Sequence, residues 1–225
     1  MDQTLALIEG YVTEPRVHQI ATVNPEFVMT AQADAAFRHA LLTADLCLPD
    51  GIGLLYAARR RGQTLPERVP GSELVYRLAE RAAEKGWPLF LLGAAPGVAE
   101  EAGRLLSQRF PGLRIAGTYA GTPAVEENDD IVRRINDSGA SLLFVAYGAP
   151  QQDKWIERNR ANLTIVRVAM GVGGSLDFIT GRAVRAPQWA QRLGLEWLHR
   201  LVKEPWRWRR MLALPRFGWR VMVGR

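Results

Sequence analysis

Short apolar runs alternate with longer amphipathic segments along most of this chain. Six of these runs are apolar and partly β-branched or aromatic, which are features of strands buried in a parallel sheet. They cover residues 17–23, 45–48, 88–92, 113–117, 142–147 and 165–170. Because amphipathic segments separate them, the pattern predicts an α/β fold in which helices flank a mainly parallel sheet.

The segments between the runs have the spacing of helices. Leu74, Leu78 and Ala82, for example, recur every four residues and would share one face of a helix. Gly86 follows where that helix is expected to end, because glycine readily adopts the left-handed conformation that closes many helices.

The pattern changes after Gly194. The rest of the chain is rich in Trp and Arg and is interrupted by Pro205 and Pro215, which limit helix length. We therefore expect two domains. Residues 1–194 would form the core, and residues 195–225 would form an appendage of two or three short helices, packed on the core or hinged to it.

The appendage also carries the charge surplus of the protein. Residues 196–225 contain eight Lys or Arg and two Glu, which equals the formal net charge of +6 of the whole chain, so residues 1–195 are neutral in sum. Four of the seven Trp lie in the same segment. Indole settles at the headgroup level of a membrane and Arg and Lys stay with the phosphates, so the segment suits an anionic membrane surface. A solvated helical cap and a nucleic-acid surface are the alternatives, and the neutral remainder of the chain disfavours nucleic acid.

Composition indicates the compartment. Cys47 is the only cysteine, so we expect no internal disulfide and no cysteine metal cluster, as in a reducing compartment. Residues 1–10 lack a basic region followed by an apolar stretch, and no window approaches the roughly 20 apolar residues that span a bilayer. The expected location is cytoplasmic, with peripheral attachment to the inner face of the plasma membrane.

Four polar, glycine-rich turns follow expected strands. They lie at residues 22–25, 48–53, 147–153 and 170–177. The carboxyl ends of parallel strands meet at one edge of the sheet, where α/β proteins bind their ligands. The turns therefore predict the position of the functional site.

Asp50 is the main candidate for chemistry, because Pro49 and Gly51 hold its carboxylate on rigid backbone at a strand end. It could act as a general base. The alternative is a helix N-cap, a frequent role for Asp at the start of a helix. Thr22 and Asn24 have a similar structural alternative, since Asn-Pro is an ordinary turn opener.

Several common cofactor motifs are absent from the sequence. Residues 171–174 and 50–53 do not complete the Gly-x-Gly-x-x-Gly spacing of a dinucleotide-binding turn, and no Gly-Lys-Ser/Thr phosphate loop occurs. His18, His39 and His199 lack metal-ligand spacing. We expect neither a cofactor nor a metal.

An ordered set of motifs resembles one known family. The motifs are Asn-Pro-Glu at 24–26, Pro-Asp-Gly-Ile-Gly at 49–53, Arg-Val-Pro-Gly-Ser-Glu-Leu at 68–74, Tyr-Gly-Ala-Pro-Gln-Gln-Asp at 147–153, Gly-Val-Gly-Gly-Ser-Leu-Asp-Phe at 171–178, Gly181 with Arg-Ala-Pro at 185–187, Leu-Glu-Trp-Leu-His-Arg-Leu at 195–201 and Glu-Pro at 204–205. From about residue 4 to at least residue 210, the chain resembles the WecG/TagA/CpsF glycosyltransferases of bacterial surface-polysaccharide assembly.

The resemblance implies an inverting glycosyltransferase with a Rossmann-like core. Such an enzyme moves a sugar from a UDP-sugar to a hydroxyl of a polyprenyl-diphosphate-linked sugar at the cytoplasmic membrane face. In some members a C-terminal appendage completes the active site at the membrane. The expected partners are therefore a UDP-sugar carrying N-acetylmannosamine or a related hexose, the lipid-linked acceptor and an anionic membrane surface, with no nucleic acid.

The resemblance also assigns roles to residues. Asp50 matches the family's proposed catalytic base, and Thr22 and Asn24 match pocket residues near the sugar or the diphosphate. The remaining core positions implied in substrate binding are Arg68, Gln152, Gly173, Gly174 and Asp177, of which Asp177 is assigned to uridine or ribose.

Arginines are expected to stabilise the departing UDP. The chain lacks the Asp-x-Asp motif with which many sugar transferases hold a metal at this position, so we expect a metal-independent reaction. Arg can donate two hydrogen bonds to one phosphate. Arg200, Arg207 and Arg210, which match appendage arginines of the family, are the candidates.

Two positions depart from the family pattern. The usual Pro-Lys-Gln-Glu reads Pro-Gln-Gln-Asp at 150–153, which loses one cation and shortens one carboxylate, and His199 stands where Tyr is common. A noncatalytic membrane- or nucleic-acid-binding module that uses the Arg/Trp appendage is the alternative function. Asp50, Thr22 and Asn24 at converging strand ends favour the enzyme, because a binding module would not need them.

Overall fold

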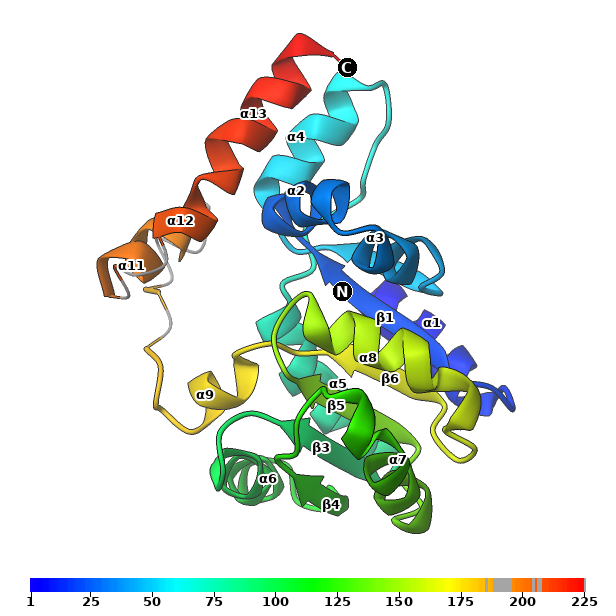
Figure 1. Cartoon of the computed structure of the whole chain (residues 1–225). Helices are drawn as coiled ribbons and strands as arrows, with labels where there is room; N and C mark the ends of the chain where they lie inside the picture. Colours follow the sequence, from blue (N-terminus) through cyan, green and yellow to red (C-terminus); the bar gives the residue numbers. More distant parts are fainter. Residues whose placement is uncertain (185, 188–195, 204, 206–207, 225) are drawn as a thin grey trace.

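The computed structural model describes residues 1–184, 186–187, 196–203, 205 and 208–224, without the side chains of residues 196, 200, 203, 209 and 210. Within this part of the chain, six parallel strands form one sheet in the order β2-β1-β6-β5-β3-β4 (Figure 1). The strands are β1 His18–Val23, β2 Leu46–Pro49, β3 Leu89–Gly93, β4 Ile115–Tyr119, β5 Leu142–Ala146 and β6 Val168–Gly171. Helices cover both faces, so the expected α/β, Rossmann-like arrangement is confirmed.

All six predicted runs form strands, with small differences at their ends. β3 and β5 are buried along their whole length, as their continuous apolar sequences require. The run at 113–117 becomes a strand only from Ile115, because the Leu113 amide bonds to the Phe110 carbonyl in a turn. The run at 165–170 becomes a strand only from Val168, and Ile165 is left 41% exposed.

β6 joins the two halves of the sheet. Its Val168 pairs with His18 of β1 on one side and with Leu142 of β5 on the other. β2 lies beyond β1, whereas β3 and β4 lie beyond β5. The first and last strands of the chain are therefore neighbours inside the sheet, and their carboxyl ends lie side by side.

Helices on the two faces enclose separate parts of the core. The core helices are α1 Asp2–Thr13, α2 Pro25–Ala33, α3 Ala35–Leu42, α4 Ile52–Arg60, α5 Gly71–Lys85, α6 Val98–Arg109, α7 Asn128–Asp137, α8 Gln151–Asn159 and α9 Ser175–Ile179, with 3-10 turns at Val125–Glu127 and Arg160–Asn162. α1, α5 and α6 pack on one face, and α7 and α8 pack on the other. Leu74, Leu78 and Ala82 are buried along α5, and Gly86 ends that helix in the left-handed conformation, as predicted.

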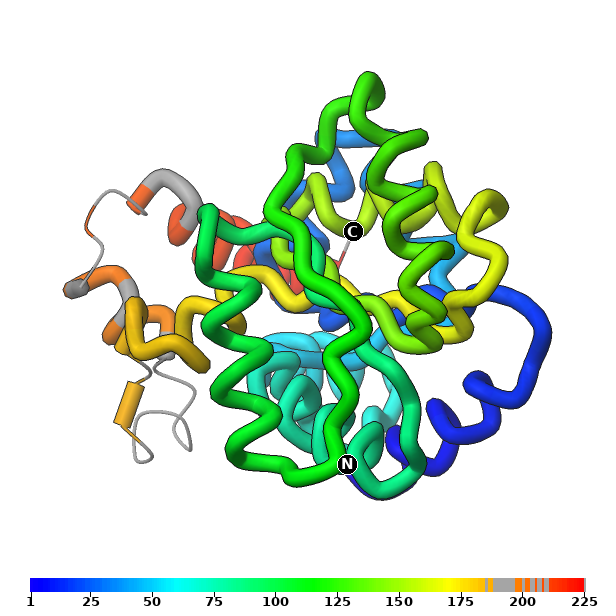
Figure 2. Tube along the Cα trace, turned by 90° about the horizontal axis from the view of Figure 1, so that it is seen from below, coloured from blue at the N-terminus to red at the C-terminus, as the bar shows by residue number. Residues whose placement is uncertain are grey.

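The appendage contains three helices in its described part, within the predicted two or three. They are α11 Glu196–Lys203, α12 Trp208–Met211 and α13 Ala213–Val223. α11 and α12, in orange, lie at one side of the molecule in both views (Figures 1 and 2). α13 returns to the core, packs against α2 and α4, and buries Phe217. The expected domain boundary at Gly194 falls outside the described residues, and none of the described helices has the length and hydrophobicity to traverse a bilayer.

Candidate active site

A cavity of about 700 Å³ lies at the carboxyl ends of β1, β2, β5 and β6. Each of the four predicted polar turns contributes to its lining, through residues that include Asn24, Asp50, Gly148 and Gly173. The turns therefore converge as the sequence pattern indicated, because parallel strands bring their carboxyl ends to one edge.

The appendage forms another wall of this cavity. Its lining residues include Trp197, His199, Met211, Leu214, Phe217, Val221 and Met222. Helix α4 adds Ile52 and Tyr56. The strand-end wall is polar and glycine-rich, whereas the wall from α4 and the appendage is largely apolar. This arrangement suits a ligand that has a charged or polar part and an apolar part.

The predicted site residues fall into three groups. Those that line the cavity are Thr22, Asn24, Asp50, Arg68, Gln152, Gly173 and Gly174. Asp177 is not part of the lining formed by the described residues; it lies in the first turn of α9, and its carbonyl accepts a hydrogen bond from the Ala183 amide at 3.1 Å. Arg207 and the side chains of Arg200 and Arg210 lie outside the described part of the chain.

The backbone holds Asp50 at the rim of the sheet. Its amide donates to the carbonyl of Val23 at 2.7 Å, which ties the end of β2 to the end of β1. The N-cap position of α4 is Gly51, so Asp50 precedes the position that the capping alternative assigned to it. A Cβ atom at Gly51 would lie 2.7 Å from Cδ of Pro25, so the turn after Asp50 requires glycine. The carboxylate therefore stands on a tightly packed turn that faces the cavity.

Thr22 lies deeper in the same wall. Its side chain is buried, and a Cβ atom at Gly71 would lie 2.9 Å from its hydroxyl oxygen. Gly71 is the first residue of α5, so the absence of a side chain there lets the helix start directly against β1. This contact explains why a glycine is needed in the motif at residues 68–74.

Asn24 has a structural role that the sequence offered as an alternative. Its Oδ1 accepts a hydrogen bond from the Phe27 amide at 3.0 Å, and Pro25 occupies the first position of α2. Asn24 is therefore a helix N-cap that also lines the cavity. A polar contact from Asn24 to a ligand would have to use the side-chain groups that do not take part in the cap.

Gln152 fastens the glycine-rich turn after β6. Its side chain is 3% exposed, and its Oε1 accepts a hydrogen bond from the Gly173 amide at 2.9 Å. A Cβ atom at Gly171 would lie 2.4 Å from Nε2 of Gln152, so the turn can pass over Gln152 only because residue 171 is glycine. Sequence reasoning placed Gln152 in the site but missed this support of the turn.

Asp153, the shortened carboxylate of the same motif, points into the protein and is outside the described lining of the cavity. It is fully buried, and burial raises the pKa of its carboxyl to about 7. The backbone carbonyl of Asp153 accepts a hydrogen bond from Nε2 of Gln19 at 3.1 Å, so this residue connects α8 to β1. Its position indicates a role in the core.

We predict that Asp153→Asn raises the melting temperature at about pH 8. The pKa of this carboxyl in the folded protein lies above the ordinary value near 4, so folding favours its protonated form. The contribution of the protonated carboxyl to the free energy of unfolding is complete below about pH 4 and is lost as the pH rises through about 7. Asn imitates the protonated form without titrating. The expected gain at about pH 8 is on the order of 2–4 kcal/mol. Melting curves at several pH values measure it, and a difference that does not change with pH would contradict the assignment.

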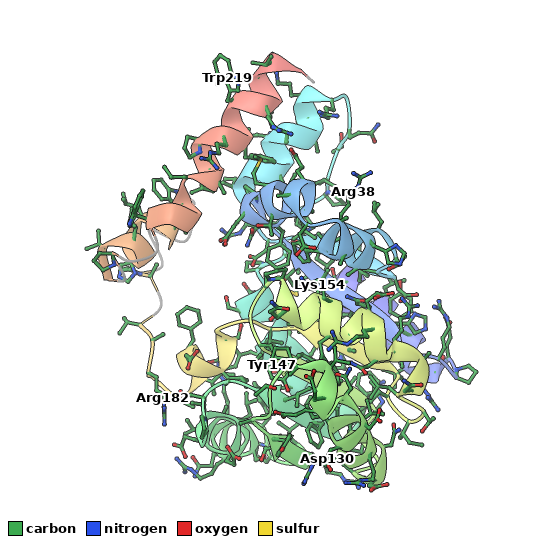
Figure 3. All side chains as sticks on the ribbon, viewed as in Figure 1. Arg38, Asp130, Tyr147, Lys154, Arg182 and Trp219 are labelled. Atoms are coloured by element: carbon green, nitrogen blue, oxygen red, sulfur yellow. The ribbon has the colours of Figure 1, made fainter. Side chains whose placement is uncertain are left out.

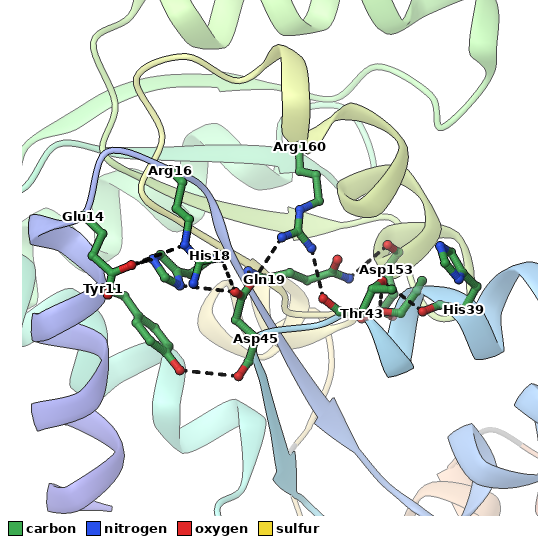
Figure 4. A network of polar contacts seen from close by, with 11 residues as sticks. Tyr11, Glu14, Arg16, His18, Gln19, His39, Thr43, Asp45, Asp153 and Arg160 are labelled. Atoms are coloured by element: carbon green, nitrogen blue, oxygen red, sulfur yellow. Dashed lines mark hydrogen bonds and ion pairs between the residues drawn. The ribbon is translucent and has the colours of Figure 1, made fainter.

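A polar network surrounds the amino end of β1, at the edge of the sheet opposite the cavity (Figure 4). His18 lies between Glu14 and Asp45, with Nε2 3.0 Å from Glu14 Oε2, and its ring stacks on Tyr11. Burial raises the pKa of the Asp45 carboxyl, but hydrogen bonds from the Gln19 amide and the Arg16 guanidinium outweigh this effect and hold it below its usual value. The network thus anchors the start of the first strand.

The described residues contain no group of three or more His, Cys, Asp and Glu side chains arranged to hold a metal ion. The sequence led us to expect that the appendage completes the site, but it did not single out Tyr56 or Phe217 as residues of the cavity. Tyr56 and Phe217 carry no motif signal, and they meet at the cavity only because α13 packs back on the core.

Known proteins are similar to this chain in sequence. The model of the glycosyl transferase WecG/TagA/CpsF family matches residues 1–225. A protein of Bacillus subtilis named N-acetylglucosaminyldiphosphoundecaprenol N-acetyl-beta-D-mannosaminyltransferase is 36% identical over 216 residues, which are 96% of this chain and 83% of that protein. A protein of the same name from Bacillus spizizenii is 36% identical over 207 residues, which are 92% of this chain and 79% of that protein. With a match over its whole length and these relatives, the chain belongs to the WecG/TagA/CpsF family of glycosyl transferases.

Proposed function

We propose that this protein transfers N-acetylmannosamine, or a related hexose, from a UDP-sugar to polyprenyl-diphosphate-linked N-acetylglucosamine, with inversion at the anomeric carbon. The names of the two Bacillus relatives support this sugar and this acceptor. The observation that carries the proposal is the cavity, which combines Asp50 on a rigid turn with an apolar wall. A sugar attached through a diphosphate to a lipid has the matching combination of polar and apolar parts.

Asp50 serves as the general base in this proposal. It takes the proton of the acceptor hydroxyl while that oxygen attacks the anomeric carbon, and the bond from that carbon to UDP breaks in the same displacement. Attack from the side opposite the leaving group inverts the configuration. Thr22 and Asn24 shape the pocket beside the reacting groups, and Gln152 keeps the turn at Gly173 and Gly174 in place.

The departing UDP carries growing negative charge that the protein has to stabilise. Arg68 lines the cavity and places one positive charge in its wall. Arg200, Arg207 and Arg210 of the appendage are the proposed partners for the diphosphate, because preorganised guanidinium groups stabilise such charge in a site with little water. The contact of Asp177 with uridine or ribose stays a prediction.

We further propose that the enzyme acts as a peripheral protein on the cytoplasmic face of the membrane. Its acceptor is held there by a lipid, and the appendage combines arginines with exposed Trp197, Trp208 and Trp219. Such a surface binds anionic lipids reversibly. Docking would bring the cavity to the acceptor.

A transfer assay tests the reaction. The protein is incubated with different UDP-sugars and a synthetic, short-chain lipid diphosphate of N-acetylglucosamine, and the product is analysed by mass spectrometry and NMR. We expect transfer from UDP-N-acetylmannosamine and an inverted anomeric configuration. Retention of configuration would exclude the single displacement, and the absence of transfer from every UDP-sugar would contradict the proposed function.

The reaction is expected to continue in excess EDTA. Arginine side chains take the role of a metal ion at the diphosphate in this proposal, so chelation should change the rate by less than about twofold. Losing a group that stabilises the charge of the transition state would lower the rate far more than that. The measurement compares initial rates with EDTA, with added magnesium and with added manganese. Activity that disappears with EDTA and returns with either metal would show that arginines do not suffice.

A further inference from the structure

One wall of the cavity is apolar and is formed by two neighbouring helices. Helix α4 contributes Ile52 and Tyr56, which lie four residues apart and therefore share one face of the helix. Helix α13 contributes a longer stripe, made of Leu214, Phe217, Gly218, Val221 and Met222. In the described lining, the part that comes from these two helices contains no charged side chain. The wall therefore offers mainly hydrophobic contact, and a phosphate finds no cation on it.

The apolar side chains of this wall lack a cover. Tyr56 and Met222 are each 62% exposed and Ile52 is 38% exposed, although all three line the cavity. The outer side of α13 is a different surface, because Trp219 lies there (Figure 3) and is not part of the described lining. Large apolar side chains that stay exposed inside a cavity indicate a place for an apolar part of a ligand.

The two helices that form the wall are fixed to each other. They lie side by side (Figure 1), and their carboxyl ends meet at Arg60. Its Nε donates to the carbonyl of Val221 and its Nη2 donates to the carbonyl of Met222, each at 3.0 Å. Carbonyls in the last turn of a helix have no partner within the helix, so Arg60 satisfies two of them. The shape of the wall is therefore set by the fold and does not wait for a ligand.

Gly218 leaves a hollow in the middle of the α13 stripe. Glycine is unfavourable inside a helix, so its presence there needs a reason. Packing explains Gly53 of α4, because a Cβ atom at that position would lie 3.2 Å from Cγ of Pro25 and 3.6 Å from Cε1 of Phe217. A Cβ atom at Gly218 would meet nothing within 4 Å beyond its own helix. Packing against the described residues therefore does not require glycine at 218, and the missing side chain leaves space in the cavity.

We infer that this wall is a groove for the first isoprene units of the acceptor, with the hollow at Gly218 at its centre. The inference rests on the proposed function, which supplies a polyprenyl-diphosphate acceptor. The UDP-sugar has no apolar chain, so only the acceptor matches a wall without charge. The groove belongs to the same cavity as Asp50, and the stripe from Leu214 to Met222 is roughly 12 Å long. It covers only the beginning of a polyprenol, and the protein thereby recognises the lipid itself.

Binding of prenyl diphosphates that carry no sugar tests the groove. Calorimetry compares farnesyl diphosphate with dimethylallyl diphosphate, which have the same diphosphate and differ only in the length of the prenyl chain. Both are used without membranes and below the concentration at which they form micelles. We expect the wild type to bind farnesyl diphosphate at least about tenfold more tightly, because burial of roughly two methylene groups already corresponds to that ratio. Equal affinities for the two diphosphates would overturn the inference.

Side chains added at Gly218 locate the prenyl chain. Gly218→Leu fills the hollow, so its affinities for the two diphosphates should agree within about twofold, and Gly218→Ala should lower the preference less. The control is Gly10→Leu, because Gly10 also lies in a helix, α1, with nothing within 4 Å of a Cβ atom, and is exposed outside the described lining. Leu has a higher helix propensity than Gly, so neither Leu variant should melt at a lower temperature. A preference for farnesyl diphosphate that persists in Gly218→Leu would place the chain elsewhere on the protein and refute the groove.

Transfer kinetics separate this inference from the proposed function. N-acetylglucosamine is offered to the wild type on a dimethylallyl and on a farnesyl diphosphate. We expect the longer chain to lower KM by about tenfold and to leave kcat unchanged, because the groove holds the chain equally in the ground state and in the transition state. No transfer to either acceptor would contradict the proposed function, while the binding assay would still decide about the groove. Transfer to both acceptors with the same KM would leave the proposed function intact and overturn the groove.

Discussion

Replacing Asp50 by Asn is expected to lower turnover by roughly 100-fold or more, the effect typical of losing a positioned general base. The affinity for UDP should stay nearly unchanged, because a base acts in the transition state and contributes little to donor binding. Asn has almost the same shape, and the backbone contact between residue 50 and Val23 does not depend on the carboxylate. Initial rates and UDP titration by calorimetry measure the two quantities.

Asp137→Asn is the matched control for this experiment. Asp137 is exposed at the end of α7 and undergoes the same chemical change far from the cavity, so its variant should turn over as the wild type does. Wild-type turnover by Asp50→Asn would end the assignment of the base. A large fall in melting temperature without a specific kinetic defect would indicate a structural role for Asp50 instead.

Deleting all residues after Gly194 is expected to abolish both vesicle binding and transfer while a folded core remains. The six strands of the described sheet end by Gly171, so the deletion leaves every strand in place. It removes the appendage wall of the cavity together with the proposed diphosphate-binding arginines. Circular dichroism establishes that the core is folded, and the two activities are then measured separately.

Point variants distinguish the two tasks of the appendage. Arg207→Gln and Arg200→Gln should each lower transfer to a soluble acceptor by about 100-fold, the scale of losing one donor to a developing anion. Arg216→Gln/Arg220→Gln should weaken binding to anionic vesicles and leave that transfer intact, because both arginines are exposed and outside the described lining of the cavity. Transfer to the soluble acceptor by the truncated core at the full-length rate would show that the appendage is only an anchor.

The strand positions could be predicted from the sequence because buried parallel strands require nearly continuous apolar residues. The amphipathic spacing of Leu74, Leu78 and Ala82 was likewise sufficient for α5. The edge of the sheet that bears the site followed from the polar turns, since parallel strands place all such turns together. Asp50, Thr22 and Asn24 were found in this way.

Contacts between distant segments could not be predicted in the same way. Strands β3 to β6 lie between Tyr56 and Phe217 in the sequence, and local spacing does not reveal that the two residues line the same cavity. Gln152 supports the turn at Gly173 through a hydrogen bond that depends on the crossing of α8 and β6, which no motif encodes. Asp177 shows the opposite case, because a residue within a strong motif lies outside the described lining of the cavity.

The place of β6 in the sheet has a consequence for synthesis of the protein. During translation the chain has made β1 to β5 before residue 168 leaves the ribosome, yet β1 and β2 have no strand that pairs them with β3, β4 and β5 until β6 is present. The apolar edges of both halves stay uncovered for this period, which is the state in which nascent chains bind chaperones or aggregate. The pocket cannot form on the growing chain, and a polypeptide released early, before residue 171, would carry Asp50 without any of the glycine-rich turn that faces it.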